Sequence, residues 1–273
     1  GHRWGQRRER GRHFRARAMS TGTVLVTGAG GFVGSSLTAS FAELGLDVIA
    51  VDRAFDNDLG GVLSTEGPPS HARAGAETDL ARGRVHRLVG DLDAALVRRL
   101  PPVDLVVHGA WVTADPGSLG TTREEYRARN LEPLQHLLEW ARASRPKAFV
   151  FLSSTGVFAA DDAVDELTDT DTPTSTAPYA EAKRAGERLT LDFAGSPDPF
   201  VVRLGYLWGP GERPRPTRPR RSLVTEWIAA AVRGEPLPVR ADDPVRDWTY
   251  TGDLASAVLR VVEGESTRRP IHL

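Results

Sequence analysis

Short apolar runs alternate with longer stretches of helical periodicity along most of the chain. The apolar runs are typical of buried parallel strands and lie at residues 24–26, 48–51, 85–89, 104–108, 148–152 and 200–204. Apolar residues recur at helical spacing over residues 32–44, 123–143, 179–193 and 223–232. Pro133 should kink the second of these helices or mark where it begins. The alternation predicts an α/β fold, a doubly wound parallel sheet with helices on both faces.

The first predicted strand runs directly into a glycine-rich turn, T-V-L-V-T-G-A-G-G-F-V-G, at residues 23–34. Glycine permits a sharp turn and the close approach of a pyrophosphate, and the helix that follows offers free N–H groups to phosphates. The common G-x-G-x-x-G spacing does not fit, but the glycines do fit G-x-x-G-x-x-G. The turn therefore predicts a dinucleotide site. Its expected contacts are Gly28, Gly31, Phe32, Val33 and Gly34.

Asp52 ends the second predicted strand, about 20 residues beyond the glycine turn. A carboxylate at this position can accept both ribose hydroxyls of NAD and would repel the 2′-phosphate of NADP. The neighbouring Arg53 leaves NADP open, because a basic side chain can bind that phosphate. The sequence favours NAD.

Tyr179 and Lys183 stand four residues apart at the start of a predicted helix, behind Pro178. We expect the lysine cation to lower the phenol pKa toward neutrality. Tyr179 could then exchange a proton with a substrate hydroxyl or carbonyl while hydride passes to or from a nicotinamide. The alternative is a structural tyrosine beside a surface lysine. The catalytic interpretation is favoured because the only other lysine of the chain is Lys147.

These motifs resemble the extended short-chain dehydrogenase/reductase family, and within it the NAD-dependent epimerases and dehydratases, over essentially residues 23–273. Besides T-G-x-x-G-F-x-G and Y-x-x-x-K, the resemblance rests on S-S-T-G-V-F at 153–158, R-L-G-Y-L-W-G-P-G at 203–211 and R-D-W-T-Y-T-G-D-L-A at 246–255. It implies a Rossmann sheet, and catalysis by Ser154, Tyr179 and Lys183, with Thr155 as the fallback hydroxyl. Thr155-Gly156 stands where dehydratases carry an acid pair, which disfavours elimination chemistry.

The resemblance also assigns roles to residues that pattern alone would leave unassigned. Asn130 would hold a water molecule of the proton relay. The implied cofactor contacts are Asp91 and Leu92 beside the adenine, and His108 and Ala110 under the nicotinamide phosphates. The implied substrate contacts are Ser153, Thr155 and Arg246. Arg246 would hold the diphosphate of a nucleotide sugar, and the alternative is a surface ion pair with Asp247 or Asp253.

Several positions depart from the family pattern. Trp111 replaces a small residue, Phe158 a tyrosine, Ala159 a glycine and Tyr206 an asparagine. Residues 213–221 carry five arginines among prolines, which favours a surface loop and leaves open a lid that meets a substrate phosphate.

The sequence as a whole predicts an NAD-dependent epimerase or dehydrogenase acting on a sugar-like hydroxyl, with a nucleotide sugar as the preferred substrate. A reductase of a non-nucleotide carbonyl is the alternative. A non-catalytic dinucleotide-binding regulator is disfavoured by the intact Tyr179 and Lys183. Relatives commonly dimerise through the helices predicted at 123–143 and 179–193, so we expect a homodimer.

The composition limits the cellular compartment and the kinds of partner that we expect. The chain has 273 residues and no cysteine, which excludes disulfides and a cysteine nucleophile and favours a reducing compartment, the cytoplasm. Its seven histidines lack metal-ligand spacing, so no metal is expected. No stretch is apolar enough to predict membrane insertion. Net charge is −1, but residues 1–18 hold seven arginines against Glu9, which leaves about −7 for the remainder and makes nucleic acid an unexpected partner of the folded part.

The expected organisation has three parts. Residues 1–19 form a basic leader, expected to be disordered, with an RNA-binding arm as the alternative. Residues 20–203 form the dinucleotide-binding domain, with an irregular connection at 54–83 and a short helix near 76–81. Residues 204–273 form a small substrate lobe, expected to be truncated because family members usually continue.

Overall fold

The computed structural model describes residues 22–55, 83–159, 162, 167–193, 197–215, 218, 220–239 and 246–273. The predicted basic leader, and nearly all of the connection at 54–83 with its possible helix, lie outside the described residues.

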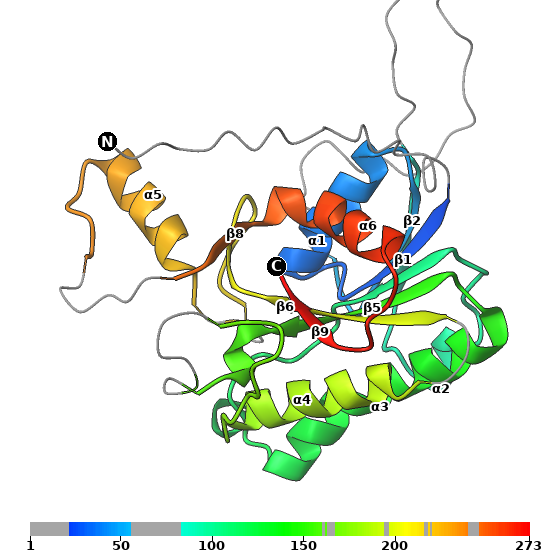
Figure 1. The fold of residues 1–273 in the computed structure, drawn as a ribbon. Coiled ribbons are helices and arrows are strands. Elements are labelled where there is room, and N and C mark those ends of the chain that lie inside the picture. Colours follow the sequence, from blue (N-terminus) through cyan, green and yellow to red (C-terminus); the bar gives the residue numbers. More distant parts are fainter. Residues whose placement is uncertain are drawn as a thin grey trace, which may run out of the picture.

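Seven parallel strands form the main sheet, in the order β3-β2-β1-β4-β5-β6-β9 (Figure 1). Their bounds are Thr23–Thr27 (β1), Asp47–Asp52 (β2), Val85–Val89 (β3), Leu105–His108 (β4), Ala148–Ser154 (β5), Asp198–Leu204 (β6) and Pro270–His272 (β9). The strand order reverses between β1 and β4, and parallel sheets bind ligands at such a point, beyond the carboxyl ends of the strands. The predicted doubly wound sheet is confirmed.

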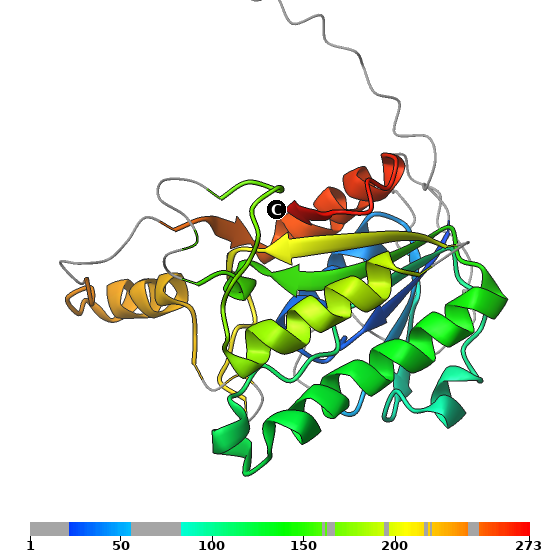
Figure 2. The ribbon, with the colours of Figure 1, turned by 60° about the horizontal axis from the view of Figure 1, so that its bottom comes forward.

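Helices cover both faces of the sheet (Figures 1 and 2). One face carries α1 (Phe32–Glu43) and α6 (Leu254–Glu263), and the other carries α2 (Ala94–Val97), α3 (Arg123–Ser144) and α4 (Pro178–Leu191). Every residue of β4, and almost every residue of β5 and β6, is buried, which explains why these strands are continuous apolar runs. The two cores, one on each face, hold the strand ends in place.

Helix α3 is a single helix with Pro133 inside it. Its start is fixed by a capping box: the Thr122 hydroxyl accepts from the Glu125 N–H at 3.1 Å, and the Glu125 carboxylate accepts from the Thr122 N–H at 2.9 Å. The helix therefore begins ten residues before Pro133, and the option that it begins at the proline is wrong.

A smaller unit lies beyond the carboxyl ends of the strands and contains α5 (Leu223–Arg233) and a two-stranded parallel sheet of β7 (Tyr206–Trp208) and β8 (Trp248–Tyr250). The predicted lobe at 204–273 is larger than this unit. Helix α6 buries Leu254, Ala255 and Val258 in the same core as α1, and β9 pairs with β6. Helix α6 therefore covers the main sheet, and β9 extends it. None of the helices in the described ranges is long and apolar enough to cross a membrane.

Candidate active site

The glycine turn between β1 and α1 is packed too tightly for side chains at Gly28, Gly30 and Gly34. Gly28 has φ +73°, and a Cβ on it would lie 2.7 Å from the Ala110 nitrogen. A Cβ on Gly34 would lie 2.1 Å from the Gly28 carbonyl oxygen. Helix α1 starts behind Gly31 with no side-chain cap. Backbone that a ligand can approach closely, leading into an uncapped helix N-terminus, fits the pyrophosphate of a dinucleotide.

Asp52 is oriented by the backbone at the end of β2. Its carboxylate accepts from the Gly30 N–H at 2.9 Å and from the Arg53 N–H at 2.7 Å. Arg53 extends to Asp91, beyond the end of β3, with 3.8 Å between Nε and Oδ1. The pair is exposed, but it gives the arginine a carboxylate neighbour at the place where a 2′-phosphate would bind. The structure thus brings together the predicted ribose and adenine residues Asp52, Arg53 and Asp91.

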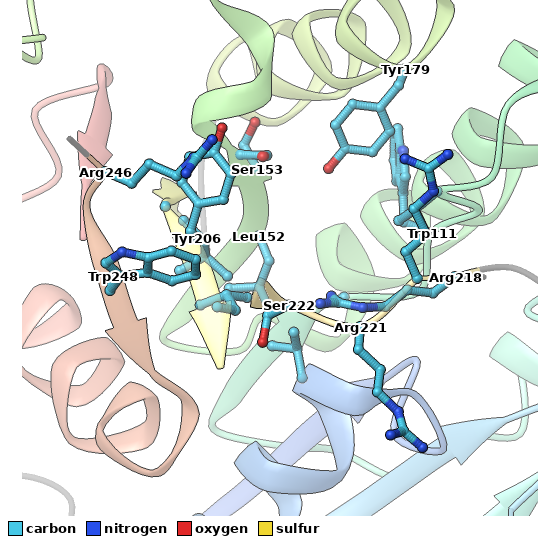
Figure 3. Close-up of a pocket in the computed structure, with 18 of the residues that line it drawn as sticks. Trp111, Leu152, Ser153, Tyr179, Tyr206, Arg218, Arg221, Ser222, Arg246 and Trp248 are labelled. Atoms are coloured by element: carbon cyan, nitrogen blue, oxygen red, sulfur yellow. The ribbon is translucent and has the colours of Figure 1, made fainter. Parts of the chain in front are cut away.

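A cavity of about 660 Å³ opens beyond the carboxyl ends of β5 and β6 (Figure 3). It brings together the predicted residues Val33, Ser153, Ser154, Tyr179, Lys183 and Arg246. Its remaining lining includes Trp111, Tyr206, Arg218, Arg220, Arg221, Glu226 and Trp248. The cavity therefore joins the start of α1 to the tyrosine–lysine helix and to a group of arginines.

Tyr179 lines this cavity, and the pKa of its phenol is raised, so the phenol keeps its proton. Burial raises the pKa of its phenol, while the Ser154 hydroxyl and the Arg218 guanidinium act in the opposite direction. Ser154 is held at the end of β5, where its hydroxyl accepts from the Gly156 N–H at 3.0 Å. The prediction that Lys183 brings the phenol pKa toward neutrality is wrong for this structure, because burial outweighs the nearby charges.

Lys183 is buried behind the tyrosine. Its ammonium donates to the Leu152 carbonyl at 2.6 Å and lies 4.1 Å from the centroid of the Trp111 ring, but 6.0 Å from the Tyr179 ring. Burial lowers its pKa to about 7, against the attraction of Glu187. The large Trp111 fits because α4 has Gly186 opposite it, where a Cβ would lie 3.2 Å from the indole.

Ser153 lines the cavity but is committed to a buried ion pair. Its hydroxyl donates to Glu187 at 2.6 Å, and Glu187 accepts from Arg203 through two bonds of 2.9 Å. All three residues are at most 5% exposed. The proton of this hydroxyl is therefore used to fix β5, β6 and α4. The contact of Ser153 with a substrate stays a prediction.

The arginine strap, residues 212–215, 218 and 220–222, reaches back to the glycine turn. Arg215 donates to the Gly30 carbonyl, and the Arg218 guanidinium lies 4.8 Å from the centroid of the Phe32 ring. The sequence left open whether this segment is a plain surface loop or a lid. Its described part lies against the glycine turn, where the cofactor is expected.

Residues 24–272 match the model of the NAD dependent epimerase/dehydratase family. The chain belongs to this family. The family and fold predicted from the motifs are confirmed, and the family's description names NAD, in agreement with the predicted cofactor.

Several relatives of this chain have names that refer to nucleotide sugars. UDP-glucuronate 4-epimerase 1 of Arabidopsis thaliana is 30% identical over 90% of the chain and 56% of its own length. A dTDP-4-dehydro-6-deoxy-D-allose reductase of Streptomyces bikiniensis is 29% identical over 88% of the chain and 72% of its own length. Among solved structures, MoeE5 in complex with UDP-glucose and NAD has a TM-score of 0.66 at 29% identity, covering 92% of this chain and 75% of its own. The chain thus spans a little over half of the first relative and about three quarters of the others.

Four residues that the family resemblance assigned to the site are not among the residues that line the cavity. His108 is fully buried, with Nδ1 2.7 Å from the Thr27 hydroxyl, so it has no surface for a cofactor. Leu92 packs in the core between the sheet and α3. Asn130 is buried, accepts from the Val112 N–H at 2.7 Å and donates to Tyr126, so its side chain fixes the loop after β4. The Thr155 hydroxyl donates to the Leu204 carbonyl at 3.3 Å.

The sequence motifs did not predict three residues at or beside this cavity, Trp248, Glu187 and Arg218. Trp248 lines the cavity two positions after Arg246, and residues two apart on an extended segment point the same way, so the R-D-W motif held that signal. Glu187 stands four residues after Lys183 and continues its helix face, a spacing that could have drawn attention to it. Nothing in the local pattern singles out Arg218 among the arginines of the strap.

Proposed function

We propose that this protein is a nucleotide-sugar epimerase or dehydrogenase that uses NAD for hydride transfer and Tyr179 as its acid/base. The observation that carries the proposal is the cavity itself. It joins a half-buried phenol to the start of α1, at Val33, and to arginine side chains that suit phosphates. The relatives named above support the substrate class.

NAD would be held by the glycine turn, by Asp52 at the ribose and by the surface near Arg53 and Asp91. Bound NAD supplies a hydride acceptor and donor. The preference for NAD over NADP rests on the Asp52 carboxylate and on the carboxylate of Asp91 beside Arg53.

Tyr179 would accept the proton of a substrate hydroxyl when the carbon loses hydride, and return a proton when the carbonyl is reduced. Ser154, whose hydroxyl lies beside the phenol, would hydrogen-bond the same substrate oxygen as charge develops on it. Lys183 would stand behind Tyr179 as a buried amine that is charged below its pKa of about 7, and Trp111, Phe151 and the Leu152 carbonyl fix it in place.

The diphosphate of the substrate would meet Arg246 and Arg220 on the side of the cavity away from α4. The Arg246 guanidinium lies 5.2 Å from the centroid of the Tyr206 ring, and this contact orients it. Tyr206 and Trp248, with ring centroids 5.4 Å apart, form the adjoining wall. Epimerisation and net oxidation or reduction use the same residues, so the substrate decides between them.

The deciding experiment incubates the protein with NAD and a panel of UDP-, GDP- and dTDP-sugars, and follows isomers by NMR and NADH by absorbance. Tyr179→Phe should reduce turnover by about 10²–10⁴-fold and leave NAD affinity nearly unchanged, because it removes a proton and little surface. Arg246→Ala should raise KM for the nucleotide sugar and weaken inhibition by UDP in parallel.

Wild-type turnover by Tyr179→Phe would overturn the mechanism. Failure of UDP, GDP and dTDP to bind would overturn the nucleotide-sugar assignment, and NADH turnover with a free carbonyl substrate would then identify the non-nucleotide reductase. The homodimer and the cytoplasmic location stay predictions.

A further inference from the structure

Arg218 extends from the arginine strap toward Tyr179 across one end of the cavity. Figure 3 shows its side chain rising beside the phenol ring, with Trp111 next to it, whereas the neighbouring Arg221 points the opposite way. Arg218 and Tyr179 line the same cavity although they belong to different units of the fold. The strap therefore brings a permanent positive charge to the acid/base of the dinucleotide-binding domain.

The position of this guanidinium is fixed by three contacts. Glu212 accepts from Arg218 at 2.5 Å, and the Glu212 side chain is 1% exposed. The guanidinium lies over the Phe32 ring, and backbone bonds of 2.8 and 2.9 Å join Arg215 and Arg218. A side chain held by a buried carboxylate and a ring, on a backbone bonded to Arg215, loses little freedom on facing a ligand.

Glu212 is itself held in the charged form. Burial disfavours its charge, but hydrogen bonds from Ser222 and Thr225, with the pairing to Arg218, outweigh burial and keep the pKa of Glu212 below its ordinary value. The charged carboxylate thus anchors both Arg218 and the start of α5.

We propose that Arg218 is a positioning residue of the acid/base, the fixed cation that keeps the Tyr179 phenol within reach of proton transfer. The proposal rests on the proposed function, in which Tyr179 exchanges the substrate proton. A guanidinium keeps its charge at every working pH, whereas the ammonium of Lys183 does not, since burial brings the Lys183 pKa to about 7.

The groups that face Tyr179 come from four elements. Ser154 at the end of β5 and Arg218 from the strap lower its pKa, and burial raises it. Tyr126 on α3 interacts with it electrostatically and is itself neutral, because burial raises the Tyr126 pKa. Lys183 lies behind the phenol on α4. Of the two cations in this set, Arg218 is the one whose charge does not vary with pH.

The test measures the phenol directly and needs no substrate. The chain has four tyrosines, so a protein labelled with 3,5-difluorotyrosine gives four ¹⁹F signals. Electron withdrawal by fluorine lowers phenol pKa values into the range where the fold is stable, and Tyr179→Phe assigns the signal. The titration is run on the full chain, alone and with saturating NAD.

Arg218→Gln should raise the midpoint of the Tyr179 signal by about one pH unit, and Arg218→Lys should restore most of the shift. Arg221→Gln is the matched control, with the same charge change on a side chain that points away from Tyr179, and should leave the midpoint near the wild-type value. Equal shifts in the Arg218 and Arg221 variants, or no shift in Arg218→Gln, would overturn the inference. Wild-type turnover by Tyr179→Phe would instead overturn the proposed function, so the two failures are distinct.

Discussion

Lys183 is a charged group held where its charge is disfavoured, so its protonation is coupled to folding. Burial lowers its pKa in the folded chain to about 7, and an unfolded lysine has a pKa of about 10.4. Between these values the unfolded chain binds a proton that the folded chain does not. The contribution of Lys183 to the free energy of unfolding therefore rises as the pH increases through this window.

We expect Lys183→Met to remove that rise. Urea unfolding at about pH 6 and about pH 9 measures it, as the difference between wild type and variant at each pH. Lys147→Met is the matched control, because the side chain of Lys147 is 69% exposed and pairs with Asp104. A Lys183→Met variant that tracks the wild type at both pH values would contradict the lowered pKa.

Glu187 and Arg203 form a buried ion pair, and removing one partner leaves the other charge buried and unpaired. Glu187→Gln leaves Arg203 without its ionic partner at 3% exposure and leaves the Ser153 hydroxyl with a weaker acceptor. We expect the free energy of unfolding to fall by about 3–5 kcal/mol. Denaturant titration measures this loss.

Glu181→Gln on the same helix is the control, because its ion pair with Arg123 is exposed and should contribute less than about 1 kcal/mol. Equal losses in the two variants would show that burial is not what makes the Glu187 pair costly to break.

Helices and strands could be predicted from the sequence where the pattern lies within a single segment of the chain. Buried parallel strands are continuous apolar runs, so the strands β1 to β6 are close to their predicted bounds. The pair β7 and β8 has three residues in each strand, about forty residues apart in the chain, and no periodicity develops over three residues. That pairing exists only in the folded molecule.

The same limit applies to the site. Gly28, Tyr179 and Lys183 could be found because motif spacing fixes them relative to the ends of strands. The direction of the Tyr179 pKa shift could not, because it depends on how deeply several distant segments bury the phenol. His108 was assigned to the cofactor by motif, but the sheet turns its ring into the core, where it stacks on Phe151.

Asp52 at the end of β2, and Arg53 and Asp91 near it, should determine whether the protein binds NAD or NADP. Asp52→Ala removes a carboxylate that accepts from the glycine turn and lies where the adenosine ribose would bind. We expect the preference for NAD over NADP to decrease, with weaker NAD binding and unchanged or stronger NADP binding. Calorimetric titration of both cofactors measures this preference. Tighter NADP binding by the unmodified protein would mean that Arg53 governs the site despite its pairing with Asp91.

At the scale of the whole molecule, the homodimer through α3 and α4 stays a prediction, but its basis has changed. The apolar residues of both helices were expected to need cover from a second subunit. In the structure they pack on the sheet and on each other, and Leu134, Leu137, Leu138 and Ala141 of α3 belong to the core. Within the described residues, the exposed large apolar side chains concentrate on α5 and the segment after it, as Ile228, Val232, Leu237 and Val239.

Light scattering at micromolar concentration with two charge variants separates these surfaces. If the dimer forms through α3 and α4, Arg127→Glu on the exposed side of α3 should shift the mass toward the monomer, because it reverses a charge in the interface. Val232→Glu, at a side chain 83% exposed on α5, should then leave the mass unchanged. A monomeric wild type contradicts the dimer. A mass that falls only in Val232→Glu places the association at α5, where a charge would have to be buried against an apolar partner at a cost of several kcal/mol.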